Sequence, residues 1–187
     1  MIPIILLLVP IILFSQTARQ ESIVMVIAHE NFRDEELLIP KKIFTEEGYK
    51  VVIASTDTTP AKGMLGARVK PGIAISDISD SLFSAIVLVG GSGSKTLFSD
   101  TALHRIVQDF NRQKKPVAAI CLAPVILGKS GIIKGRKATV WAGAKEELIH
   151  LDVDYQSEDV VVDSNIITGC GPKVAETFAR KILEILK

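Results

Sequence analysis

This chain has few aromatic residues, few histidines and little net charge. Aromatic side chains make up 5% of its 187 residues, and its formal charge at pH 7 is +1. Because there is no long basic run and no interleaved aromatic stripe, nothing in the sequence favours nucleic-acid binding. No Cys, His, Asp or Glu cluster has the spacing of metal ligands, and no motif indicates a metal or another cofactor. The sequence also contains no repeat and no low-complexity segment.

Hydrophobic residues are abundant, at 48% of the chain, and one run of them lies at the N-terminus. Residues 2–14 are almost continuously apolar, and a polar segment follows. Because the run is short for a membrane span, we interpret residues 1–20 as a signal peptide or hydrophobic leader. No Lys or Arg precedes it, so an uncleaved anchor and a mistaken start codon stay open as alternatives. A signal peptide would send the protein out of the cytoplasm, and an uncleaved leader would be its one membrane contact.

Residues 21–187 are enough for one domain and alternate between strand and helix patterns. Short β-branched apolar runs predict strands, here at residues 22–28, 51–54, 85–89, 117–120, 137–140, 153–155, 160–162 and 166–168. Amphipathic segments predict helices, here at residues 34–47, 100–111, 125–128 and 173–186. Pro40 lies either within the first helix or at its start, and residues 56–75 predict a small hairpin excursion. This order predicts an α/β three-layer sandwich with a mostly parallel sheet.

Cys121 follows the predicted strand 117–120 and precedes a helical segment. In an open α/β sheet the ligand crevice lies at the carboxyl ends of the strands, and the following helix presents its positive end there. These features favour an ionised, reactive thiol, whereas a small buried hydrophobic residue is the alternative. Gly90 and Gly91 follow strand 85–89 in the same way. Their amides are suited to an anion or oxyanion site, although a plain tight turn is equally consistent.

Six segments carry a resemblance to a known family. They are EELLIP at 35–40, GYKVVIA at 48–54, VLVGG at 87–91, PVAAIC at 116–121, GIIKGRKAT at 131–139 and GP at 171–172. In this order they resemble the ThiJ/PfpI superfamily over essentially all of the chain after Glu21. The resemblance implies a flavodoxin-like, class I glutamine amidotransferase-like sandwich and a homodimer or larger assembly. It also implies a nucleophile elbow at Cys121, a hydrogen bond from Glu36 to that cysteine, and oxyanion-hole amides from Gly91 and the turn at Leu122.

Both histidines that the family uses are absent from their positions. Members that resemble the intracellular protease have His directly after the cysteine, where this chain has Leu122. Members that resemble the deglycase have His after a Thr-Thr pair, where this chain has Trp141 beside the expected pocket. Among the remaining histidines, His29 is the candidate for reaching Cys121, because it follows the first predicted strand at the same sheet edge.

Cys170 lies within the segment that ends in the Gly-Pro pair, which by the resemblance is near the mouth of the site. If it approaches Cys121, it could act as a resolving thiol, and in an exported protein the resulting disulfide would persist. Two unpaired thiols are the alternative, since a disulfide requires close Cα atoms.

Three functional hypotheses follow from the resemblance and the missing histidines. The first is glyoxalase-like or deglycase-like addition of Cys121 to a small reactive carbonyl, with Glu36 relaying a proton and with no metal or cofactor. The second is a non-catalytic redox sensor or chaperone-like protein. The third is a cysteine peptidase or related hydrolase, which has less support because general base catalysis usually relies on a positioned His. A glutamine amidotransferase mechanism lacks the same His.

Overall fold

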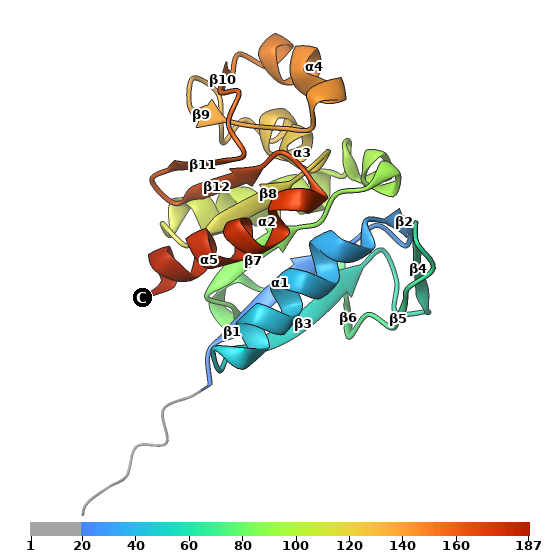
Figure 1. The fold of residues 1–187 in the computed structure, drawn as a ribbon. Coiled ribbons are helices and arrows are strands. Elements are labelled where there is room, and N and C mark those ends of the chain that lie inside the picture. Colours follow the sequence, from blue (N-terminus) through green and yellow to red (C-terminus); the bar gives the residue numbers. More distant parts are fainter. Residues whose placement is uncertain (1–19) are drawn as a thin grey trace, which may run out of the picture.

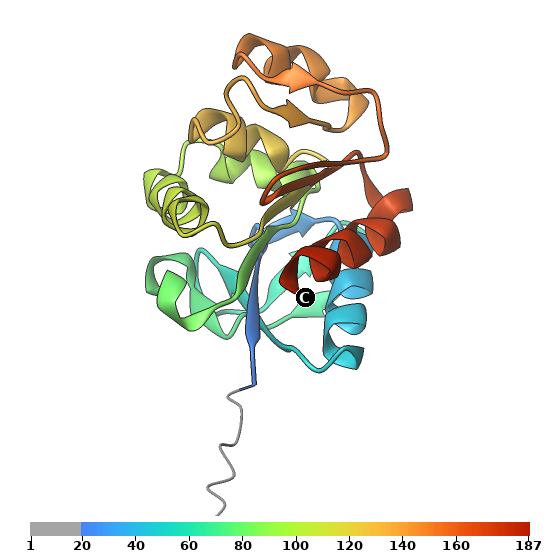
Figure 2. The same ribbon diagram turned by 90° about the vertical axis from the view of Figure 1, so that its left-hand side faces the viewer.

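A seven-stranded sheet with helices on both faces organises the computed structural model, which describes residues 20–187 (Figures 1 and 2). Its strand order is β11-β12-β8-β7-β1-β3-β6, and only β11 runs antiparallel to its neighbour. The bounds are β1 Ser22–Val26, β3 Lys50–Ser55, β6 Ile73–Ala74, β7 Ala85–Leu88, β8 Val117–Ile120, β11 Val160–Asp163 and β12 Ile166–Gly169. The predicted α/β sandwich with a mostly parallel, flavodoxin-like sheet is confirmed. The predicted leader, apart from Gln20, lies outside the described residues.

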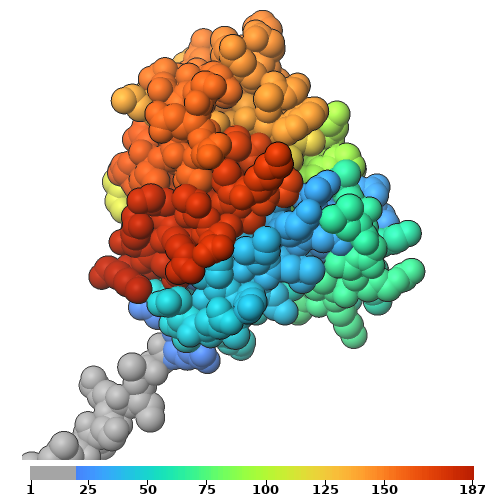
Figure 3. Space-filling model, in the orientation of Figure 1, coloured from blue at the N-terminus to red at the C-terminus, as the bar shows by residue number. Residues whose placement is uncertain are grey.

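Two pairs of helices form the outer layers (Figure 2). On one face α1 packs beside α5, and on the other α2 packs beside α3. Figure 3 shows the first pair side by side at the surface, α1 in light blue and α5 in red. The bounds are α1 Asp34–Glu46, α2 Thr101–Arg112, α3 Pro124–Lys129, α4 Lys145–His150 and α5 Ala175–Leu186.

Helix α1 begins at Asp34 and continues through Pro40. Of the two positions predicted for Pro40, the one inside the helix is therefore correct. The first turn carries three acids, Asp34, Glu35 and Glu36, at the positive end of the helix dipole. This start places Glu36 at the carboxyl edge of the sheet, beside the turn that follows β7.

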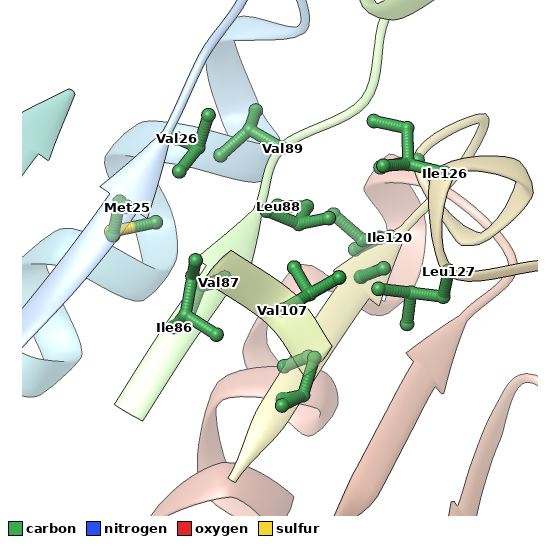
Figure 4. Close-up of a cluster of buried hydrophobic side chains, with 14 of the residues drawn as sticks. Met25, Val26, Ile86, Val87, Leu88, Val89, Val107, Ile120, Ile126 and Leu127 are labelled. Atoms are coloured by element: carbon green, nitrogen blue, oxygen red, sulfur yellow. The ribbon is translucent and has the colours of Figure 1, made fainter. Parts of the chain in front are cut away.

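The central strands β1, β7 and β8 form the middle of the core. Every residue of β7 and β8 is buried, and helices α2 and α3 cover them with further apolar side chains. Figure 4 shows Leu88, Val107, Ile120 and Leu127 from these elements in one cluster. Full burial stabilises each such side chain by roughly 1.5–3 kcal/mol. The carboxyl ends of β7 and β8, where the glycine turn and Cys121 begin, are thus fixed by packing on both faces.

Several short elements lie outside the main sheet. Strands β2 Glu30–Phe32, β4 Ala61–Gly63 and β5 Arg68–Val69 form a three-stranded sheet in which β4 and β5 are the predicted hairpin. Strands β9 Lys137–Ala138 and β10 Asp154–Tyr155 pair with each other in a separate two-stranded sheet, and β9 lies against β11 of the main sheet. The 3-10 turns are η1 Ile75–Asp77, η2 Asp80–Leu82, η3 Ser92–Leu97, η4 Ala142–Ala144 and η5 Pro172–Val174.

The predicted strand 137–140 is too long, because the chain leaves β9 after Ala138 and turns back to the site at Trp141. Within residues 20–187, no helix has the length and apolar character needed to cross a membrane. The same residues contain no group of three or more His, Cys, Asp and Glu side chains placed to hold a metal ion.

Candidate active site at Cys121

Cys121 occupies a sharp turn between β8 and α3. Its φ is +63°, in the left-handed region that residues other than glycine rarely adopt. The turn is held by its backbone N–H, which donates to the Gly169 carbonyl at 2.8 Å, and by a bond from Ala123 N–H to the Ile120 carbonyl at 3.1 Å. Unfavourable backbone conformations of this kind cluster at functional sites. The sharp strand-to-helix turn that was predicted at Cys121 is therefore present, and its role as a nucleophile stays a prediction.

The Glu36 side chain is completely buried beside Cys121. Its Oε2 accepts a hydrogen bond from Gly90 N–H at 3.0 Å, whereas Oε1 has no well-aligned hydrogen-bond partner within residues 20–187. Only glycine fits at position 90, because a Cβ there would lie 2.5 Å from the Ile120 carbonyl oxygen and 2.7 Å from Glu36 Oε2. Glu36 and Cys121 are thus neighbours in the structure, both against Gly90, and the predicted hydrogen bond between them stays a prediction.

Burial controls the titration of both groups. It raises the pKa of Glu36 from its usual 4.5 to about 7, although interactions with Cys121 and the Gly90 amide oppose the rise. Burial and then the charge of Glu36 raise the pKa of Cys121 to about 12, while the Gly91 and Leu122 amides oppose that rise. Both causes favour the neutral thiol, which is the opposite of the ionised thiol that the sequence led us to expect. The end of α3, a helix of six residues, does not outweigh desolvation and a neighbouring carboxylate.

Cys121 opens into a cleft of about 340 Å³, which we call the Cys121 cleft. It is lined by Arg33, Met64, Gly91, Ser92, Lys95, Cys121, Leu122, Trp141 and Pro172. Of the predicted pocket residues, Gly91, Leu122 and Trp141 are in this lining. Gly90 is not, because it lies behind the cleft and its N–H is bonded to Glu36. The N–H groups of Gly91 and Leu122 lie close enough to the Cys121 sulfur to lower its pKa, so these two amides are the candidates for the predicted oxyanion site.

Trp141 is tied directly to the elbow. Its backbone N–H donates to the Cys121 carbonyl at 2.9 Å. Its indole ring lies against the main chain of Gly143, where an added Cβ would collide with the ring. Trp141 as a whole is 48% exposed and forms one wall of the Cys121 cleft. At the position where the family has a histidine, this chain therefore has an aromatic side chain that lines the cleft.

His29 and Cys170 are not brought to the cysteine. His29 Nδ1 lies 3.6 Å from Asp57 Oδ1, and Nε2 lies 3.4 Å from Thr59 Oγ1. The Cys170 thiol lies 3.7 Å from Asp159 Oδ1. Both cysteines are free, and neither His29 nor Cys170 lines the Cys121 cleft. The structure thus matches the alternative of two unpaired thiols.

Sequence reasoning missed four residues of the cleft, namely Arg33, Met64, Ser92 and Lys95. The fifth additional lining residue, Pro172, belongs to the Gly-Pro segment that the resemblance placed near the mouth of the site. Ser92 carried a usable signal, because it directly follows the glycine pair. Arg33, Met64 and Lys95 gave none, because only the fold determines which of the residues at the start of α1, on the β4–β5 hairpin and on the turn η3 face the cleft.

Comparisons with known proteins identify the family of the chain. The sequence model of the DJ-1/PfpI family matches residues 21–185. Protein MJ0967 of Methanocaldococcus jannaschii is 40% identical over 175 residues, which cover 92% of this chain and 85% of that protein. Deglycase PfpI of Pyrococcus furiosus is 30% identical over 164 residues, covering 88% and 99% of the two chains. The glutathione-independent glyoxalase DJR-1.2 of Caenorhabditis elegans is 28% identical over 170 residues, covering 91% of each.

A solved structure gives the same result. The ThiJ/PfpI domain protein of Brachyspira murdochii matches with a TM-score of 0.87 and 32% identity, over 90% of this chain and 98% of that chain. The family match, the relatives and this fold confirm what the six ordered segments predicted, and the chain belongs to the DJ-1/PfpI family.

Proposed function

We propose that this protein is a cysteine-dependent enzyme that acts on small reactive carbonyl compounds, in the manner of a glyoxalase or deglycase. The observation that carries the proposal is the buried Glu36 beside a strained Cys121, with two amide donors close to the sulfur. The names of two relatives, a deglycase and a glyoxalase, support the same class of chemistry.

Glu36 takes the role of general base in this proposal. Burial and the Glu36 carboxylate favour the neutral thiol of Cys121, so attack requires a group that removes its proton. A base works best when its pKa lies near the working pH, and the pKa of Glu36 is about 7. Burial of Glu36 thus supplies what the missing histidine would otherwise provide.

The first step forms a hemithioacetal. As Sγ of Cys121 bonds to the aldehyde carbon, Glu36 takes the thiol proton and the carbonyl oxygen becomes an oxyanion. The N–H groups of Gly91 and Leu122 stabilise that charge, and Glu36 then returns the proton to the oxygen. With a 2-oxoaldehyde, a proton shift from C1 to C2 converts the adduct to a thioester. Water hydrolyses the thioester to a 2-hydroxy acid and the free thiol.

The other hypotheses have less support. A redox sensor needs a thiolate that oxidises readily, and burial raises the pKa of Cys121 instead. A cysteine peptidase usually relies on a histidine beside the cysteine, and His29 contacts Asp57 and Thr59 instead. Self-association stays a prediction that size-exclusion chromatography with light scattering tests.

Turnover of methylglyoxal to lactate tests the proposal. We expect Cys121→Ser to lower kcat by on the order of 10³-fold or more, because it removes the nucleophile. Cys170→Ser is the matched control, since Cys170 is also a free thiol at the end of a neighbouring strand and lies outside the cleft. Equal lactate formation by the wild type and Cys121→Ser would contradict the proposal.

A further inference from the structure

The Cys121 cleft has one lining cation whose charge is not compensated. Its two charged lining side chains are Arg33 and Lys95. The Arg33 guanidinium donates to both carboxylate oxygens of Glu35, at 2.9 and 3.1 Å, so its charge is largely balanced. Lys95 is exposed and forms no ion pair with any carboxylate among residues 20–187. The lining therefore favours a ligand with a negative charge.

The cleft also has an apolar side. Met64, Leu122, Trp141 and Pro172 line it, and Met64 and Trp141 are 43% and 48% exposed. Large apolar side chains grouped at an exposed site commonly mark a binding surface. The bond from Trp141 N–H to Cys121 and the contact of its ring with Gly143 hold the indole in place. An apolar ligand group would therefore meet a preformed wall.

The size of the cleft exceeds the needs of a three-carbon substrate. At about 340 Å³ it falls within the range of about 300–1,000 Å³ that is typical of pockets for drug-sized ligands. A small dicarbonyl would occupy only the part next to Cys121. The remaining space can hold a larger group that reaches more of the lining.

From these observations, and resting on the proposed function, we infer that the preferred substrates are 2-oxoaldehydes that carry an aromatic or bulky apolar group and a carboxylate. Trp141 and Met64 pack against the apolar group, and Lys95 pairs with the carboxylate. Sγ of Cys121 bonds to the aldehyde carbon as described above. Glu36 takes the thiol proton and transfers it to the former carbonyl oxygen. No oxidant or other co-reactant is needed for this addition.

Binding is measured without turnover through Trp141, the single tryptophan of the chain. The probes are phenylacetate and its neutral analogue phenylacetamide, titrated while tryptophan fluorescence is followed. We expect phenylacetate to bind roughly three- to fivefold more tightly, as for an exposed ion pair, and Lys95→Gln to abolish this preference. Lys62→Gln is the matched control, because Lys62 is an exposed lysine outside the cleft and should keep the preference.

Three outcomes would overturn the inference. They are equal binding of the two probes to the wild type, loss of the preference in Lys62→Gln as well, and no saturable fluorescence change with either probe. Turnover provides a second readout, with phenylglyoxal and 4-carboxyphenylglyoxal as substrates. The KM ratio of the two should favour the carboxylate in the wild type and approach unity in Lys95→Gln. A protein that binds phenylacetate selectively but converts neither aldehyde would refute the proposed function and leave the binding inference intact.

Discussion

Two cysteines follow two neighbouring strands of this sheet, yet their surroundings differ. β8 and β12 pair in parallel with Ile120 opposite Gly169, so Cys121 and Cys170 leave the sheet at the same level. Cys121 is buried, has a φ of +63° and lies beside the fully buried Glu36. Cys170 is half-buried, and the nearest acid to its thiol, Asp159, is exposed.

The comparison shows that a position at the end of a parallel strand is not enough to make a cysteine reactive. Burial is the main cause that raises the pKa of both thiols, so neither position favours a thiolate. Cys121 differs from Cys170 in having a buried acid, Glu36, beside it. Burial raises the pKa of Glu36 to about 7, which suits it to accept a proton near neutral pH. The N–H groups of Gly91 and Leu122 at the sulfur are the second difference. A reactive cysteine here thus depends on a nearby proton acceptor more than on a low thiol pKa.

We expect the largest effect on kcat when the acid beside each cysteine, Glu36 or Asp159, is replaced by its amide. Glu36→Gln should lower kcat for methylglyoxal by about 10²–10⁴-fold, because it removes the general base, whereas Asp159→Asn should leave kcat unchanged. The wild-type kcat should rise as pH increases through about 7, since only ionised Glu36 accepts the proton. Steady-state kinetics across pH measures both effects. Equal losses in the two variants, or a kcat that falls as pH increases through 7, would remove Glu36 from this role.

The free energy of unfolding should depend on pH through Glu36 and not through Asp159. The pKa of Glu36 is raised on folding, so its protonated form is favoured and its contribution is fully present below pH 4.5. That contribution is lost as pH increases to about 7, an amount of roughly 3 kcal/mol in the free energy of unfolding. Urea unfolding at a series of pH values should show this fall in the wild type and in Asp159→Asn. If Glu36→Gln falls equally, another group is responsible.

The smallest effect is expected in the rate at which iodoacetamide alkylates each cysteine, which reports on the two thiols separately. Removing the Glu36 charge should lower the pKa of Cys121, so Glu36→Gln should alkylate Cys121 several-fold faster at pH 8 while turning over substrate more slowly. Asp159→Asn should accelerate alkylation of Cys170 less, because solvent screens an exposed acid. Peptide mass spectrometry quantifies both sites. Slower alkylation of Cys121 in Glu36→Gln would mean that the carboxyl group stabilises a thiolate.

Much of the architecture could be predicted because the central strands carry their own signal. Residues 117–120 are short, apolar and fully buried, and the structure has β8 at those residues. Strand β2 was missed because Glu30 and Asn31 are polar and exposed, and its pairing with β4 depends on distant residues. The stretch after residue 136 was misread in part, because β9 and β10 pair only with each other.

The sequence by itself determined which residues are the candidates, namely Cys121, Glu36 and the glycine pair. It also determined where they lie relative to the predicted strands and helices. Local hydrophobic pattern and turn residues specify where parallel strands end, and parallel strands end at one edge. Only the tertiary structure decided that burial raises the pKa of the Cys121 thiol, that the Gly90 N–H donates to Glu36, and that Lys95 and Trp141 line the same cleft. These properties depend on burial and on contacts between segments far apart in the chain, which no local pattern encodes.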